Sequence, residues 1–285
     1  MAKKPVKKQE VETTGHEWDG IQEYNNPLPR WWLITTYLCI IWGIGYAIAY
    51  PAIPLPGGAT PGLLGYSSRG EVAADIAAVE AQNAPLVEKI NTLELAAIAD
   101  DPEVGGFAIN GGHAVFQTFC AQCHGSGAQG AVGYPTLIDD DWLWGGSIEE
   151  IHQTISHGIR YESDLDTRAS EMPAFGEFLS KEEIAGLVEY VSSLSDINGA
   201  EETEEGKNLF LDNCAACHAD DGTGDRFVGA PNLTDAIWLY GSDEETLTET
   251  VTYARFGVMP AWSGRLSESQ IRQAAVYIHS LGGGE

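Results

Sequence analysis

CAQCH (Cys120–His124) and CAACH (Cys214–His218) are two copies of one pattern, 94 residues apart in a chain of 285. The similarity continues on both sides of each motif, at offsets of 94, 96 and 87 residues. Because the offset falls from 96 to 87, the first copy has nine extra residues, around residues 160–169. The second half of the chain is therefore an internal duplication. The recurring pairs include Gly112 and Gly206, Phe116 and Phe210, Pro135 and Pro231, Leu137 and Leu233, Trp142 and Trp238, and Met172 and Met259.

The Cys-x-x-Cys spacing alone fits a zinc site, a redox disulfide or a haem attachment. A histidine directly after the second cysteine favours haem, because the two thiols bond the porphyrin edge and the histidine binds its iron. A zinc site needs two further ligands at close spacing, and a thioredoxin-like site needs a βαβ pattern. The sequence shows neither. It predicts two covalent haem c groups, one on Cys120 and Cys123 with His124 as iron ligand, the other on Cys214 and Cys217 with His218.

Methionine is scarce in this chain, and its positions are informative. Apart from the initiator, the methionines are Met172 and Met259, each followed by proline and each at the same place in its copy. Methionine closes the sixth position of a haem iron and raises its potential, as electron transfer requires. We expect both to ligate iron. The rival ligands His113, His152 and His157 in the first copy have no counterpart in the second.

Each copy is predicted to be mostly helical. A first helix leads into the cysteine motif, another covers about 147–158 or 243–256, and a last one closes the copy. That last helix begins at Ser180 or Ser267, with Glu183 or Gln270 three residues on, which is the pattern of a capping box.

Residues 31–50 are twenty consecutive uncharged residues, WWLITTYLCIIWGIGYAIAY. As a helix they span about 30 Å, the thickness of a bilayer core, with aromatic residues near both ends. A buried soluble helix would keep a polar face. A cleaved signal peptide is the stronger rival, since Ala47-Ile48-Ala49 resembles a cleavage site. The apolar run exceeds the usual signal length and follows a polar region that is thirty residues long, so we expect an uncleaved anchor.

Charge is unevenly distributed along the chain. The net charge is −27, and from residue 106 onward there are 29 Asp and Glu against 8 Lys and Arg. Such a surface repels nucleic acid and attracts basic proteins. Basic residues precede the apolar run, whereas only Arg69 falls within the twenty residues after it, so the positive-inside rule predicts a cytoplasmic N-terminus and external modules. The basic residues before the run are Lys3, Lys4, Lys7, Lys8 and Arg30.

A Pro-x-Leu sequence follows each cysteine motif, and with it the region 106–285 resembles the class I cytochrome c fold. The resemblance implies that Pro135 and Pro231 offer carbonyls to the axial histidines, and that Leu137 and Leu233 pack on the haems. Residues 13–32 are similar to the N-terminal signature of the dihaem subunit (subunit III) of cbb3-type cytochrome c oxidases.

This second resemblance implies an electron-transfer subunit. It would be anchored by a single pass in the bacterial inner membrane, with its haem domains in the periplasm. It would pass electrons from a basic cytochrome c donor, soluble or anchored, to the other subunits of the oxidase. The chain itself would hold no oxygen-reducing site. A free membrane-tethered shuttle and a dihaem peroxidase-like enzyme are the alternatives.

The expected fold is mainly α, with one N-terminal transmembrane helix followed by two tandem class I cytochrome c domains. We assign 1–30 to a cytoplasmic tether, 31–50 to the transmembrane helix, 51–105 to a periplasmic linker and helical spacer, and 106–198 and 199–285 to the two domains.

Overall fold

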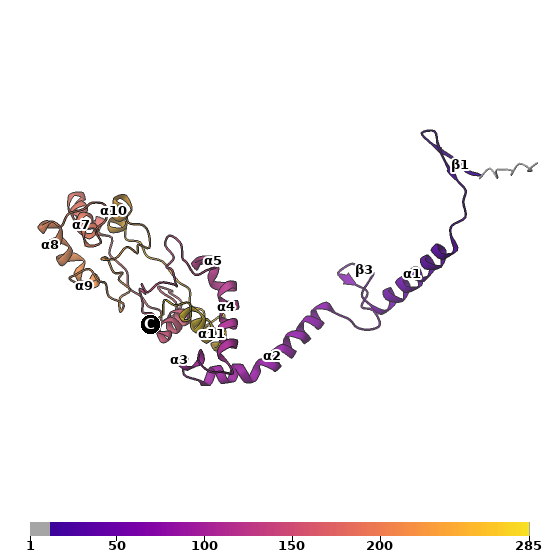
Figure 1. Cartoon of the computed structure of the whole chain (residues 1–285), viewed down its shortest axis with the longest axis horizontal. Helices are drawn as coiled ribbons and strands as arrows, with labels where there is room; N and C mark the ends of the chain where they lie inside the picture. Colours follow the sequence, from indigo (N-terminus) through magenta and orange to yellow (C-terminus); the bar gives the residue numbers. More distant parts are fainter. Residues whose placement is uncertain (1–11, 285) are drawn as a thin grey trace, which may run out of the picture. The chain divides into compact units, whose positions relative to one another are not determined.

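The computed structural model describes residues 12–284 and is mainly helical, as predicted (Figure 1). Four of the basic residues on which the orientation depends, Lys3, Lys4, Lys7 and Lys8, lie outside the described residues. Contacts divide the chain into two units, residues 1–82 and residues 83–285.

The first unit contains two short hairpins around one helix. Strands β1 (Thr13–Trp18) and β2 (Ile21–Tyr24) pair antiparallel, as do β3 (Pro54–Leu55) and β4 (Gly58–Ala59). The β1–β2 hairpin falls in the segment 1–30, which we assign to the tether and for which no hairpin was predicted. Its turn is Asp19-Gly20, with φ of 48° and 83°. This is the pairing of residues that two-residue hairpin turns favour, because both positions need positive φ.

Helix α1 (Arg30–Ala49) matches the expected anchor to within one residue at each end, and none of its side chains is buried. Among residues 12–284 it is the one helix long and apolar enough to cross a membrane. Its two threonine hydroxyl groups are satisfied within the helix, because Thr35 and Thr36 donate to the carbonyls of Trp31 and Trp32, both at 2.9 Å. Internal pairing of this kind suits a helix surrounded by lipid.

Helix α2 (Ser68–Thr92) forms the expected helical spacer and is followed by α3 (Leu95–Ile98). The end of α2 is anchored in the second unit. Ile90 is fully buried, and Arg272 donates from Nε to its carbonyl oxygen at 2.9 Å. Lys89 bridges Asp101 at 2.8 Å and Glu103 at 2.7 Å.

The second unit contains two groups of packed helices, which we call lobe A and lobe B. Each has its own buried apolar clusters. Lobe A holds α4 (Gly105–Val115), a π-helical turn η1 (Phe116–Cys120), α5 (Ala121–His124), α6 (Ile148–His157) and α11 (Glu268–His279). Lobe B holds a 3-10 turn η2 (Phe175–Glu177), α7 (Lys181–Leu194), α8 (Glu204–Asn213), α9 (Ala215–His218) and α10 (Glu244–Tyr253).

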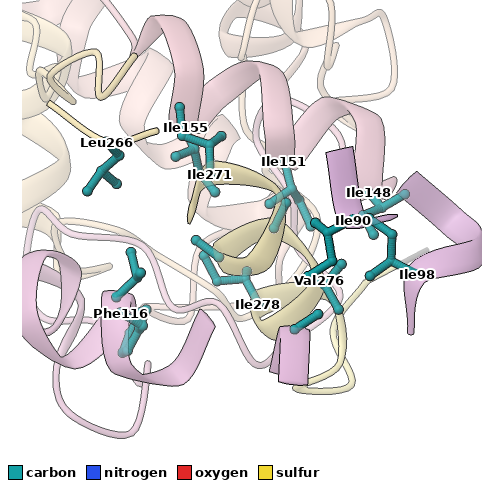
Figure 2. Packing of buried hydrophobic residues seen from close by; sticks show 14 of the residues in the cluster. Ile90, Ile98, Phe116, Ile148, Ile151, Ile155, Leu266, Ile271, Val276 and Ile278 are labelled. Carbon is teal, nitrogen blue, oxygen red and sulfur yellow. The ribbon is translucent and has the colours of Figure 1, made fainter. Parts of the chain in front are cut away.

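Each lobe combines helices from both sequence copies. Helix α11 closes the second copy, yet it packs on α4 and α6 of the first. Helix α7 closes the first copy, yet it packs on α8 and α10 of the second. Figure 2 shows this mixing in lobe A, where Ile271, Val276 and Ile278 of α11 meet Ile151 of α6 and Phe116 of η1. The sequence copies 106–198 and 199–285 thus contribute their last helices to each other's packing.

Local features of the last helices and of the longer loop follow the sequence. Capping boxes are present at Ser180 with Glu183 and at Ser267 with Gln270, as predicted. The nine-residue excess forms a loop closed by a backbone hydrogen bond from Arg160 N to Arg168 O at 2.8 Å. This loop is part of the connection that carries the first copy from lobe A to lobe B.

Candidate haem sites

The first cysteine motif lies at the end of a distorted helix. The π-helical turn η1 ends at Cys120, and α5 then carries Cys123 and His124. Cys120 faces inward and Cys123 is exposed. Burial, and after it the neighbouring Cys123, raises the pKa of the Cys120 thiol to about 11. The two sulfurs thus sit at the rim of a cavity, one inside and one at its edge, as attachment to a porphyrin edge requires.

His124 is held in place by a hydrogen bond to the backbone of Pro135, eleven residues further along the chain. Its Nδ1 lies 2.9 Å from the carbonyl oxygen of Pro135. Burial lowers the pKa of His124, and the hydrogen bond to Pro135 offsets part of that shift. Because a carbonyl can only accept, the proton sits on Nδ1 and the Nε2 lone pair is free. A neutral imidazole fixed in this way is the form that binds iron.

The second motif repeats this geometry. Nδ1 of His218 lies 3.1 Å from the carbonyl oxygen of Pro231, and burial lowers its pKa as it does for His124. Burial, together with the nearby Cys217, raises the pKa of Cys214 to about 11. Cys217 is exposed. Leu233 is buried in lobe B, and Leu137 packs against the core of lobe A.

Both motifs open onto one continuous cavity of about 840 Å³. Its wall includes the histidines of both motifs and both candidate sixth ligands, Met172 and Met259. Arg160, Arg255 and Arg265 also line it, although cations are scarce on this half of the chain. Sequence reasoning did not single out these arginines. Arg160 belongs to the nine-residue excess, so no repeat signal marked it.

An unpaired buried donor on this wall fits a group with carboxylates. Trp238 lines the cavity, and its Nε1 is buried without a hydrogen-bond partner among the described residues. A buried donor left without an acceptor is costly, so an acceptor is expected there. A haem propionate would supply one. The equivalent Trp142 is satisfied within the protein, because its Nε1 donates to the carbonyl of Gly283.

The rival histidines lie elsewhere. His152 Nε2 is 3.0 Å from Glu268 Oε1, and His157 Nδ1 is 3.2 Å from Asp164 Oδ1. His113 lies beside Tyr277, with ring centroids 5.2 Å apart. Within the part of the chain that the structure describes, the histidines on the cavity wall are His124 and His218.

Small helical lobes that present Cys-x-x-Cys-His motifs to a shared cavity define a c-type cytochrome. Comparison with known families agrees with this class and narrows it. The family described as cytochrome c oxidase, cbb3-type, subunit III matches residues 107–191 and 201–278, and the N-terminal domain of cytochrome oxidase-cbb3, FixP, matches residues 10–56. The chain belongs to the cbb3-type cytochrome c oxidase subunit III family.

Curated relatives agree over the full length. A cbb3-type cytochrome c oxidase subunit CcoP from Cereibacter sphaeroides is 58% identical over 290 residues, covering 100% of both chains. A subunit FixP from Sinorhizobium medicae is 52% identical over 276 residues, 96% of each chain. A subunit CcoP from Rhodobacter capsulatus is 52% identical over 297 residues, 100% of both.

Proposed function

We propose that this chain is a dihaem electron relay of a cbb3-type oxidase, anchored by α1 with its N-terminus in the cytoplasm and its lobes in the periplasm. Cys120 and Cys123 would hold one haem c, and Cys214 and Cys217 the other. His124 and His218 would bind the irons from one side. Met172 and Met259 would complete the ligand sets, and Pro135, Pro231, Leu137 and Leu233 would orient the histidines and pack on the haems.

The shared cavity is the observation that carries this proposal. Haem c, when bound, takes up and releases one electron at its iron. Because residues of both motifs line one cavity, both groups would face it. That arrangement suits transfer from one haem to the other. Methionine at the sixth position would keep small molecules from the iron, which favours transfer over catalysis.

The acidic surface supports the choice of donor. With 29 Asp and Glu against 8 Lys and Arg from residue 106 onward, the modules attract a basic cytochrome c and guide its approach. The relatives are named as oxidase subunits, which supports partner subunits that carry the oxygen chemistry.

Purification of the tagged full chain in mild detergent tests this function. We expect two haem c groups per chain, and copurification of a haem- and copper-containing oxidase that consumes oxygen with a reduced cytochrome donor. The variant Cys120→Ser/Cys123→Ser should retain the partners and lose donor-driven oxygen uptake. A chain free of other haem subunits would support a shuttle instead. One high-spin haem with peroxide turnover would support a peroxidase-like enzyme.

A further inference from the structure

The segment that carries Met259 is built into lobe A, although it belongs to the second copy. Met259 and Ile159 exchange backbone hydrogen bonds, with Ile159 N to Met259 O at 2.9 Å and Met259 N to Ile159 O at 3.0 Å. Just beyond, Trp262 N donates to Ile155 O at 3.1 Å. The Met259 side chain packs against the apolar core that also contacts Cys120. Thus Met259 shares its surroundings with the first cysteine motif.

The segment that carries Met172 belongs to the first copy but packs against lobe B. Its side chain packs against a buried cluster of lobe B that includes Leu247 and Val251 of α10, and Cys214 touches the same cluster. The turn η2, which follows Met172, packs closely against α10. A β-carbon on Gly176 would lie 2.8 Å from the carbonyl oxygen of Thr252. Thus Met172 shares its surroundings with the second cysteine motif.

The helices after the two methionines are exchanged in the same way, at equivalent points of the repeat. A β-carbon on Gly112 would lie 2.6 Å from Cβ of Tyr277, and one on Gly206 would lie 2.8 Å from Cβ of Tyr190. Gly112 and Gly206 are repeat equivalents, and so are Tyr277 and Tyr190. Each glycine therefore meets the expected tyrosine, but the tyrosine comes from the other copy. Both exchanges are consistent with one reciprocal swap of the C-terminal third of each copy.

We propose that the axial ligands are crossed between the copies: Met259 binds the iron of the haem on Cys120, Cys123 and His124, and Met172 binds that on Cys214, Cys217 and His218. This inference rests on the proposed function, since it presupposes methionine ligation. It means that neither copy forms a complete haem site alone. The two sites must then fold together, because each draws a ligand and a packing helix from the other copy.

Single-haem variants of the full chain test the crossing directly. Cys214→Ser/Cys217→Ser leaves the first haem alone, and Cys120→Ser/Cys123→Ser leaves the second. In the first background, Met259→Leu should abolish the far-red methionine-to-ferric-iron charge-transfer band, and Met172→Leu should leave it intact. In the second background the two effects should be reversed. Leucine keeps the apolar volume, so packing is matched between the variants.

A second measurement keeps both haems, in case a single-haem chain fails to fold. Leu137→Gln places a polar side chain against the core of lobe A, which Cys120 also contacts, and should shift the midpoint potential of one redox step. Combined with Met259→Leu, it should leave the other step at its wild-type potential, because both changes act on one haem. Combined with Met172→Leu, it should move both steps.

The outcomes separate the crossing from the function on which it rests. The opposite pairing in either experiment, with Met172 acting on the first haem, overturns the crossing and leaves methionine ligation standing. If neither Met→Leu variant changes the band or a potential, the ligand set in the proposed function is wrong as well. The expected pattern in either measurement supports the crossing, because no uncrossed arrangement produces it.

Discussion

Gly112 packs directly against Tyr277, so closely that a β-carbon on the glycine would lie 2.6 Å from the tyrosine Cβ. The two residues belong to different sequence copies and join helix α4 to helix α11 in lobe A. The absence of a side chain at residue 112 is what lets these two helices approach.

We predict that Gly112→Ala destabilises the chain by about 2 kcal/mol, because the added methyl forces α11 away from α4. The loss should appear although alanine is the better helix former by about 1 kcal/mol. Thermal unfolding of the purified full chain, followed by far-ultraviolet circular dichroism, measures it.

The matched control is Gly106→Ala in the same helix. Gly106 is exposed, and a β-carbon there would meet nothing within 4 Å. This change should leave stability equal or slightly raised. Equal stability of the two variants would show that α4 and α11 do not pack in this way.

The sequence predicted local features well and the pairing of helices not at all, for a physical reason. A capping box such as Ser180 with Glu183 depends on residues three apart, so its pattern is complete in the sequence. The swap depends on which of two equivalent tyrosines meets a glycine. Tyr190 and Tyr277 occupy the same repeat position, so the duplication offers identical partners and cannot distinguish them. Only the packed structure does.

The candidate site residues also divide into those that a local motif predicts and those that only the packed structure shows. His124 and Pro135 are eleven residues apart, and their contact could be anticipated from a motif. Arg160 lines the cavity from a loop that has no counterpart in the second copy. Neither motif spacing nor the repeat could therefore predict that it belongs to the site. The β1–β2 hairpin was missed although its Asp19-Gly20 turn is a local signal.

Trp238→Phe should lower the potential of one haem and leave the other unchanged. Nε1 of Trp238 is a buried donor without a partner among the described residues, and Trp238 lines the cavity. If it donates to a haem propionate, its loss leaves that negative charge less compensated, which stabilises ferric iron. A redox titration of the loaded chain measures the shift.

Trp142→Phe is the control, because Trp142 is the repeat equivalent whose donor is already used by Gly283. It should cost about 1 kcal/mol of stability through the lost hydrogen bond, with both potentials unchanged. A shift with Trp142→Phe and none with Trp238→Phe would reverse the assignment.

Asp141 should make stability depend on pH between about 4 and 6. Burial, and after it the charge of Asp235, raises the pKa of Asp141 to about 6. The folded chain therefore prefers the protonated acid. Its stabilising contribution is complete below the unfolded pKa of about 4 and is lost as the pH rises through about 6. Allowing for solvent screening at a half-buried site, the loss amounts to about 1 kcal/mol.

Unfolding midpoints measured from pH 4 to pH 7 show this slope, and Asp141→Asn should flatten it. Asp140→Asn removes the same charge from an exposed neighbour and should leave most of the slope in place, because the charge of Asp140 contributes least to the raised pKa of Asp141. If both variants keep the wild-type slope, burial of Asp141 does not produce it.

Electron uptake from a basic cytochrome should slow as salt is added. The lobes carry a large excess of negative charge, with 29 acidic against 8 basic residues from residue 106 onward. Attraction over this surface raises the encounter rate, and ions screen it within about 10 Å at 0.1 M salt. We expect the second-order rate constant to fall about tenfold between low and high salt. Stopped-flow reduction of the loaded chain measures it. With a small anionic reductant the same charges repel, so that rate should rise with salt. A rate with the basic donor that does not depend on salt would mean that docking relies on an uncharged surface instead.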